Sequence, residues 1–197
     1  MFKLNTPLIL ASNSPRRKQL LHDAGFDFEV EVRPTDETFP ASTAPLQVAR
    51  YISEQKAEVF RDGANGKLIL TADTVVLLGD TILGKPANRE EAYVMLRSLS
   101  GNTHQVVTAV SLLANGQLTT YSDIATVSFK TLEDFEINYY LDQYKPFDKA
   151  GSYGIQEWIG MIGIDSIQGS FYTIMGLPVH IVYHILKPYM SIPSTCN

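Results

Sequence analysis

The sequence predicts an α/β fold with a mixed twisted sheet, flanking helices and a cleft between two lobes. Strand-like and helix-like stretches alternate along the 197 residues. The stretches 8–11 and 67–78 are almost wholly apolar, as strands covered on both faces are. Asn115-Gly116 joins two long β-type stretches, which indicates an antiparallel hairpin. No repeat or long linker is visible, so we expect one domain over residues 1–190 and a C-terminal tail over 191–197.

Composition describes an ordinary globular protein, with 45% hydrophobic and 19% charged residues. The formal net charge of −5 argues against a nucleic-acid polymer as partner, because such binding needs a basic surface. No stretch approaches the roughly 20 apolar residues of a membrane span. Cys196 is the only cysteine, so no intrachain disulfide can form, which fits a reducing compartment. We therefore expect a cytoplasmic protein without a membrane partner.

The first predicted strand, 8–11, runs into a helix. Ser14 suits the N-cap of that helix, and Pro15 suits its first position, where no N–H is needed. Gly25 suits the position just after its end.

The rest of the chain continues the alternation of helical spacing and strand patterns. The first half predicts a half-exposed strand over 26–32, a loop over 33–37, a helix over 45–60, a central strand over 67–78, a short extended piece over 82–86, and a helix that begins after Asn88 and ends before Gly101. The second half predicts the hairpin strands 104–113 and 117–129, a helix opened by the capping pair Thr131 and Asp134 and ending near Tyr144, an apolar stretch over 159–167 that fits helix or strand, a strand over 171–175, and a last helix after Pro178.

Polar residues gather where the first strand meets the first helix. They are Ser12, Asn13, Ser14, Arg16, Arg17 and Lys18. Hydroxyls, free N–H groups at a helix N-terminus and three cations suit an anion, above all a phosphate. Arginines in a first turn oppose the helix dipole unless an anion joins them, which favours this interpretation over a merely solvated helix surface. Neither GxxxxGK[ST] nor GxGxxG is present, so a standard P-loop is excluded.

Asp73 interrupts the apolar stretch 67–78, where a carboxylate is costly unless it is paired or bound to a metal. A general base or metal ligand and a structural carboxylate satisfied by its neighbours both fit this position, and the residues alone leave both open. Lys56, Lys85 and Lys149 carry only weak signals by themselves. The histidines, namely His22, His104, His180 and His184, show no zinc-ligand spacing.

Six short motifs occur in order along the chain. They are Ala11-Ser12-Asn13-Ser14-Pro15-Arg16-Arg17, Thr35-Asp36-Glu37, Ala72-Asp73-Thr74-Val75-Val76, Gly84-Lys85-Pro86, the stretch Asp148 to Gln156, and Gly176-Leu177-Pro178. The series resembles the Maf family of nucleoside triphosphate pyrophosphatases over about residues 8–186. This resemblance implies a fold similar to inosine triphosphate pyrophosphatases, often a homodimer, and release of pyrophosphate from a nucleoside triphosphate with a divalent cation, Mg²⁺ or Mn²⁺.

The resemblance also implies roles for single residues. Asp73 matches the proton acceptor, and Glu37 with Asp73 matches the acidic positions near the metal. The positions on the phosphate side are Ser12, Arg17, Lys56 and Lys85. The positions that select the base are Arg16, Thr74 and Gln156, and all three match the dTTP/UTP subgroup. One Gln amide can donate to O4 of uracil or thymine and accept from its N3–H.

Two alternatives remain at this stage. One is a 7-methyl-GTP pyrophosphatase, although that subgroup tends to carry an aromatic residue, Gln and Glu at the three selecting positions. The other is a nucleotide-binding regulator of cell division and septum formation that does not turn over. Glu157 departs from the glycine that often follows Gln156 in the family, and a carboxylate there is expected to loosen base selectivity.

Overall fold

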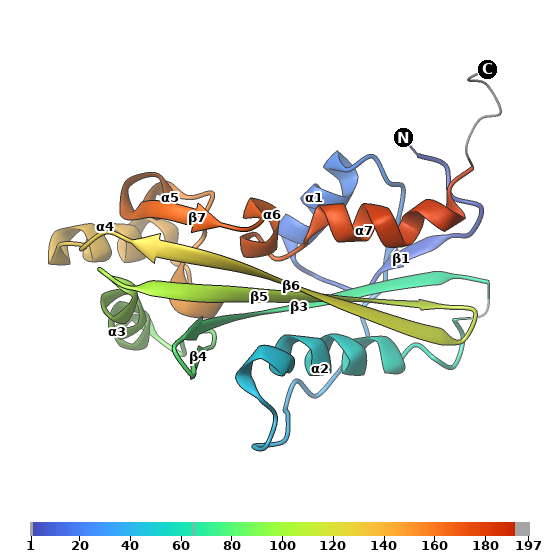
Figure 1. Ribbon diagram of the computed structural model, residues 1–197, viewed down its shortest axis with the longest axis horizontal. Coiled ribbons are helices and arrows are strands. Elements are labelled where there is room, and N and C mark those ends of the chain that lie inside the picture. The colour runs from blue at the N-terminus through green and yellow to red at the C-terminus, as the bar shows by residue number, and fades with distance from the viewer. Residues whose placement is uncertain (1, 65, 192–197) are drawn as a thin grey trace.

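The computed structural model describes residues 2–64 and 66–191, and within them it forms one seven-stranded mixed sheet flanked by helices (Figure 1). The predicted fold class is therefore confirmed. Cys196 and all of the predicted tail except residue 191 lie outside the described residues. The strands are β1 (Leu8–Leu10), β2 (Glu29–Val30), β3 (Leu68–Leu78), β4 (Thr81–Leu83), β5 (Thr103–Ala114), β6 (Gln117–Phe129) and β7 (Ile164–Gln168).

The helices lie between these strands in the sequence. They are α1 (Pro15–Asp23), α2 (Pro45–Glu58), α3 (Arg89–Leu99), α4 (Asp134–Tyr144), the 3₁₀ turn η1 (Ala150–Ser152), α5 (Trp158–Gly163), α6 (Phe171–Ile174), α7 (Val179–Leu186) and the 3₁₀ turn η2 (Lys187–Tyr189). No helix among the described residues is long and apolar enough to cross a bilayer.

Strand β3 holds the centre of the sheet, whose order is β2-β1-β3-β5-β6-β7 with β4 also paired to β3. β1 runs parallel to β2 and β3, whereas β3, β5, β6 and β7 pair in antiparallel fashion. The predicted hairpin between β5 and β6 is confirmed. Asn115 and Gly116 both have a positive φ, 51° and 76°, as a two-residue turn of this kind requires.

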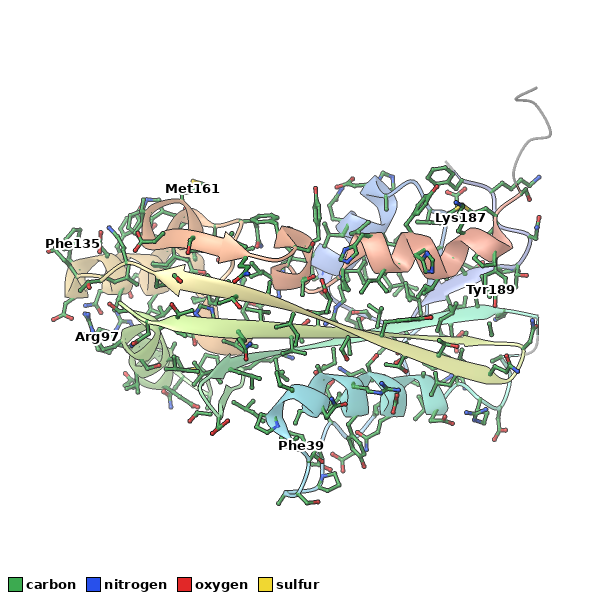
Figure 2. The ribbon with its side chains drawn as sticks, viewed as in Figure 1. Phe39, Arg97, Phe135, Met161, Lys187 and Tyr189 are labelled. Atoms are coloured by element: carbon green, nitrogen blue, oxygen red, sulfur yellow. The ribbon has the colours of Figure 1, made fainter. Side chains whose placement is uncertain are left out.

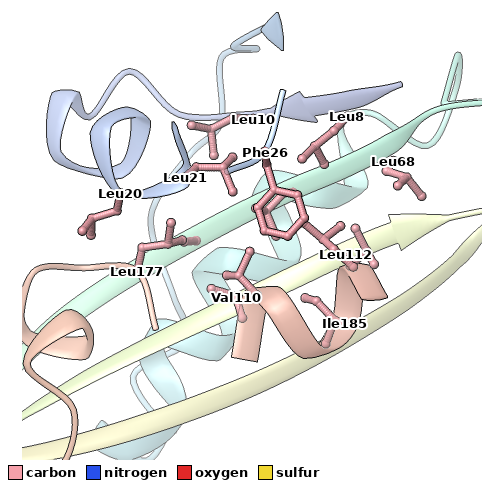
Figure 3. Close-up of a cluster of buried hydrophobic side chains, with 14 of the residues drawn as sticks. Leu8, Leu10, Leu20, Leu21, Phe26, Leu68, Val110, Leu112, Leu177 and Ile185 are labelled. Atoms are coloured by element: carbon pink, nitrogen blue, oxygen red, sulfur yellow. The ribbon is translucent and has the colours of Figure 1, made fainter. Parts of the chain in front are cut away.

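Because side chains alternate along a strand, β3 contributes residues to hydrophobic clusters on both faces of the sheet. Leu68 and Leu70 belong to one hydrophobic cluster with Leu21 of α1 and Ile185 of α7. Figure 3 shows Leu68, Leu21 and Ile185 in this cluster. Val75 belongs to the opposite face, where it packs under α2. Figure 1 shows the same arrangement, with α2 on one side of the sheet and α1, α6 and α7 on the other.

The edge of β3 that faces β1 has a gap in its strand pairing. β1 pairs with residues 68–70 and β4 with residues 76–78. Between these two pairings, residues 71–75 have no strand partner on this edge among the described residues, whereas β5 pairs with them on the other edge. Side chains from both faces of β3 can therefore reach one common space at the gap.

The molecule is elongated along the sheet (Figure 2). Phe135 and Met161 lie near one end, while Lys187 and Tyr189 lie near the other. The ends are built from separate apolar clusters, one under α3 and α4 and the other under α1 and α7.

Several expected elements differ in the structure. The strand predicted over 26–32 is limited to β2, and the strand predicted over 171–175 is wrong, because α6 is a short helix there. Its Thr173 is held by tertiary bonds, since the Thr173 carbonyl accepts from the Thr108 hydroxyl at 2.7 Å. The stretch 159–167 contains both α5 and the start of β7.

The start of α4 also differs from the prediction. The N-cap is Glu133, in a capping box with Glu136, rather than Thr131 paired with Asp134. Leu132 is 1% exposed, and its N–H donates to the Ser100 hydroxyl at 2.7 Å. This attachment fixes the chain just before the helix and moves its start beyond Thr131.

Candidate active site

A cavity of about 530 Å³ opens at the gap in the β3 edge. Its lining residues come from α1, α2 and β3 and from the loop around η1, which agrees with the expected cleft. All of the site residues predicted from the sequence line it: Ser12, Arg16, Arg17, Glu37, Lys56, Asp73, Thr74, Lys85 and Gln156. The structure thus brings these residues together from distant parts of the chain, while their individual roles remain predictions.

Asp73 and Glu37 face each other across one ammonium group. Lys56 of α2 donates to Asp73 Oδ1 at 2.8 Å and lies 2.9 Å from Glu37 Oε1. Asp73 and Val75 are two residues apart on β3, so the Asp73 side chain points to the same face of the sheet as Val75, the face covered by α2. The exposed fraction of its side chain is 12%, compared with 52% for Glu37. Lys56 therefore holds one nearly buried and one accessible carboxylate at the same point.

The two carboxylates are tuned in opposite directions. Burial raises the pKa of Asp73 above its usual value, against the opposing charges of Lys56 and Arg17. For Glu37, burial also disfavours the charged form, but the hydrogen bond from Lys56 and the charges of Lys56, Lys85 and Arg17 outweigh it and lower its pKa. A buried carboxylate with a raised pKa beside an ionised one is an arrangement suited to proton transfer.

Arg17 reaches the gap from α1, on the other face of the sheet. Its guanidinium donates from Nε to the Gly176 carbonyl at 2.8 Å, from Nη1 to the Ala72 carbonyl at 2.8 Å, and from Nη2 to the Thr74 hydroxyl at 3.1 Å. Burial lowers the pKa of Arg17, yet a guanidinium stays protonated at neutral pH. Two of its N–H donors thus bond to β3 and a third bonds to the segment between α6 and α7, while its charge remains beside the cavity.

Thr74 is part of a chain of hydroxyl groups behind Arg17. Its Oγ1 lies 2.9 Å from Thr108 Oγ1, and the Thr108 hydroxyl donates to the Thr173 carbonyl. Because the Thr108 proton is used there, Thr74 donates to Thr108 and accepts from Arg17. Thr74 is a predicted base-selecting residue, and in this structure its hydroxyl is bonded within the protein.

The junction of β1 and α1 forms the expected polar cup except for Lys18, which does not line the cavity. The Ser14 side chain accepts from the Arg17 N–H at 3.4 Å, which confirms Ser14 as N-cap. Ser12 is 7% exposed, and its hydroxyl accepts from the Ser14 N–H at 3.2 Å. Lys85 lies across the cavity as an exposed side chain just after β4. The Gly84 carbonyl beside it accepts from the Gly151 N–H at 3.0 Å, which joins this loop to η1.

The other end of the cavity is lined by Arg16 and by the loop around η1. Arg16 Nη1 lies 3.5 Å from Asp148 Oδ2, and Asp148 also bonds to Lys149 at 2.8 Å. Gln156 is exposed toward the same space. The two neighbouring arginines therefore separate, with Arg17 held at the strand edge and Arg16 directed to the loop.

Sequence reasoning gave too little weight to Lys149 and did not find Tyr140. The Lys149 side chain is only 9% exposed, lines the cavity and lies 3.2 Å from Glu157 Oε1. Glu157 in turn accepts a hydrogen bond from the Tyr140 hydroxyl. The position of Lys149 within Asp148-Lys149-Ala150-Gly151 was the one available signal, because nothing in the local pattern of α4 marks Tyr140.

The carboxylate oxygens of this site fit a cation such as Mg²⁺ only if substrate phosphates supply further ligands. No cluster of three or more His, Cys, Asp or Glu side chains is placed to hold a metal among residues 2–64 and 66–191. Glu37 and Asp73 supply two carboxylates at one point. Mg²⁺ commonly takes one or two protein carboxylates and completes its shell with water and substrate phosphates, so the two residues suit it.

The chain is similar to known proteins over most of its length. The chain is 50% identical over 184 residues to a dTTP/UTP pyrophosphatase of Parabacteroides distasonis, covering 92% of this chain and 95% of that protein. It is also 50% identical to a dTTP/UTP pyrophosphatase of Bacteroides thetaiotaomicron, covering 91% and 94%. A partial structural likeness, with a TM-score of 0.47 and 14% identity, joins it to the Staphylococcus aureus Ham1 protein and covers 62% of this chain and 71% of that chain. The family model described as Maf-like protein matches residues 7–189, and the chain therefore belongs to the Maf family.

Proposed function

We propose that this protein is a nucleoside triphosphate pyrophosphatase that hydrolyses dTTP and UTP to the monophosphate and pyrophosphate. The observation that carries the proposal is the nearly buried Asp73, with its raised pKa, beside Lys56 and Glu37 in a cavity lined by cations. The names of relatives at 50% identity support the same substrates. The reaction would remove these nucleotides from the cellular pool.

In the proposed mechanism, Asp73 orients a water molecule and takes its proton. The water oxygen forms a bond to the α-phosphorus, the bond from that phosphorus to the bridging oxygen breaks, and pyrophosphate leaves with the electron pair. A raised pKa suits this role, because a base works best when its pKa approaches the working pH. Lys56 holds the Asp73 carboxylate in place from 2.8 Å.

The cations stabilise charge on the phosphates. Arg17, Lys56 and Lys85, with Ser12 and the N-terminus of α1, face the space that the phosphates would fill. We propose that Glu37 and Asp73 hold Mg²⁺ or Mn²⁺ together with the substrate. When bound, the cation would neutralise phosphate charge and help to orient the triphosphate.

Base selection falls to Gln156, Arg16 and Thr74, which also line the cavity. We propose that Gln156 pairs with O4 and N3–H of uracil or thymine, while Arg16 and Thr74 complete the selecting set. The separation of Arg16 from Arg17 supports this division of roles. No means of excluding a ribose 2′-OH is apparent in the sequence, so dTTP and UTP are both expected as substrates. The homodimer and the cytoplasmic location expected from the sequence remain predictions.

A panel of nucleoside triphosphates tests the proposal. Purified protein with Mg²⁺ should release pyrophosphate from dTTP and UTP, and Asp73→Asn should reduce this release by about a thousandfold or more while dTTP still binds. Cleavage of 7-methyl-GTP with dTTP and UTP inert would show that the subgroup assignment is wrong. Tight dTTP binding without any pyrophosphate release would support the nucleotide-binding regulator instead.

A further inference from the structure

The turn that carries Gln156 is closed by a tyrosine from another element. The Gly154 N–H donates to the Tyr140 hydroxyl at 3.0 Å, and this hydroxyl donates to the Glu157 carboxylate. The Glu157 N–H completes the ring by donating to the Gly154 carbonyl at 3.0 Å. We call Tyr140, Gly154 and Glu157 the Tyr140 clamp. It joins both ends of the turn 154–157 to the middle of α4.

Close packing supports the same geometry. A Cβ on Gly154 would lie 2.7 Å from the Glu157 carboxyl carbon, so the carboxylate folds directly over a glycine. A Cβ on Gly160 would lie 1.9 Å from the Ile155 carbonyl oxygen, so α5 also presses against the turn. Burial and the neighbouring Glu157 raise the pKa of Tyr140, which keeps its hydroxyl protonated and able to donate. Tyr140 is 0% exposed and cannot leave this position without opening the core.

The clamp determines where the central residues of the turn point. Ile155 is 6% exposed and packs into the core, whereas Gln156 next to it faces the cavity. A binding side chain must be held to within about 0.5 Å by its supporting contacts to read a ligand well. Glu157 helps to hold the turn that carries Gln156. It presents no free carboxylate to the base, because its oxygens bond to Tyr140 and contact Lys149.

We propose that Tyr140 and Glu157 are positioning residues for base recognition, acting through the turn that carries Gln156. The inference rests on the proposed function. It reverses the expectation from the sequence, in which a carboxylate at position 157 loosens selectivity. Here Glu157 tightens selectivity, because it holds the turn against α4. Lys149 extends the same support to Asp148 and Arg16 at the base end of the cavity.

Tyr140→Phe removes the shared hydroxyl and keeps the ring in the core. The KM for dTTP should rise about tenfold with kcat within about twofold, because base contacts are lost and the phosphate contacts remain. The preference for dTTP over dCTP, as a ratio of kcat/KM, should also fall about tenfold, while inhibition by pyrophosphate is unchanged. Tyr139→Phe is the matched control. Tyr139 is 47% exposed, and its hydroxyl has no hydrogen-bond partner among the described residues, so that variant should behave as wild type.

Gly154→Ala provides a second test without touching Tyr140. The added methyl group displaces the flexible Glu157 carboxylate from the clamp, so it should reproduce the higher KM and the lower preference. If both variants keep the dTTP preference of the wild type, or if kcat and pyrophosphate inhibition change as much as KM does, the clamp has no positioning role. Failure of the wild type to hydrolyse dTTP and UTP would instead overturn the proposed function.

Discussion

The two ends of the cavity are built in different ways. The phosphate half, which we define as Ser12, Arg17, Glu37, Lys56, Asp73 and Lys85, takes its central residues from α1, α2 and β3. The base half, which we define as Arg16, Thr74, Asp148, Lys149 and Gln156, takes Arg16 from α1 and Thr74 from β3. Its other residues depend on a loop with two left-handed residues, Gly151 at φ 68° and Ser152 at φ 60°. Regular elements therefore place the central residues proposed to bind the phosphates, whereas side-chain bonds hold the loop proposed to face the base.

This difference indicates how each half can vary. Arg17, Lys56 and Asp73 of the phosphate half are fixed by α1, α2 and β3, so their geometry changes only if the packing of these elements changes. The base half is fixed by a few contacts such as the Tyr140 clamp and the pair of Lys149 with Glu157. From the proposed roles we expect substitutions in those contacts to alter base preference while the phosphate half remains intact.

The largest effect is expected from Lys56→Met in the phosphate half. Loss of the ammonium leaves Asp73 buried without its closest cation, which raises the pKa of Asp73 further. The kcat/KM for dTTP should fall about a thousandfold at pH 7, and the acid limb of its pH profile should move to higher pH. The preference for dTTP over dCTP should stay as in the wild type. An unmoved acid limb would show that Lys56 does not tune Asp73.

A smaller effect, on stability, is expected beneath the base half. Burial lowers the pKa of His104 to about 4, compared with 6.5 for an ordinary histidine. His104 is 1% exposed, and its Nε2 lies 2.7 Å from the hydroxyl of Tyr153, which lines the cavity. As the pH falls from about 6.5 to about 4, the unfolded chain takes up a proton that the folded chain does not, so folding loses about 3 kcal/mol.

His104→Gln should remove this dependence while keeping a polar partner for Tyr153. Denaturant unfolding at pH 7 and pH 4 measures the difference, and the wild type should lose about 3 kcal/mol more than the variant. Equal losses would show that His104 takes up its proton as readily in the folded protein as in the unfolded chain, so that burial does not lower its pKa. At pH 8 the kcat of the His104→Gln variant should be close to that of the wild type, because the substitution changes no residue of the phosphate half.

The smallest effect is expected from Arg50→Ala, which serves as the control on the same helix as Lys56. Arg50 bonds to Glu54 at 2.9 Å, and its side chain is 48% exposed. Exposed pairs of this type contribute up to about 0.5 kcal/mol. The melting temperature should change by no more than about 2 °C, and pyrophosphate release should not change. A loss of activity here would mean that α2 as a whole, rather than Lys56, tunes the phosphate half.

Much of the phosphate half could be predicted from the sequence, because its signals are local. A carboxylate within an apolar strand stands out, as does a helix start rich in cations. The gap in the β3 edge could not be predicted, since it depends on β1 being limited to three residues, Leu8–Leu10. That gap is the reason why Asp73 and Thr74, on opposite faces of β3, line one cavity.

The base half was predictable only through the family motifs. Nothing local marks Tyr140 as the partner of Gly154 and Glu157, because the contacts join α4 to a turn beyond it in the chain. Contacts between distant parts of the chain also explain why α6 was wrongly predicted as a strand. Its residues favour a strand by propensity, but the bonds of Thr173 to neighbouring strands fix a short helix instead. Propensity is a weak guide where tertiary hydrogen bonds decide the backbone.

The bond from Arg17 to the Gly176 carbonyl has a consequence for synthesis of the chain. It joins residues 159 positions apart, and Gly176 lies just before α7. On the ribosome, Arg17 emerges early and must wait for nearly all later residues before its cation is fully bonded. A nascent or shortened chain that ends before Gly176 therefore has the acceptors on β3, Ala72 and Thr74, but lacks the third acceptor of the Arg17 guanidinium.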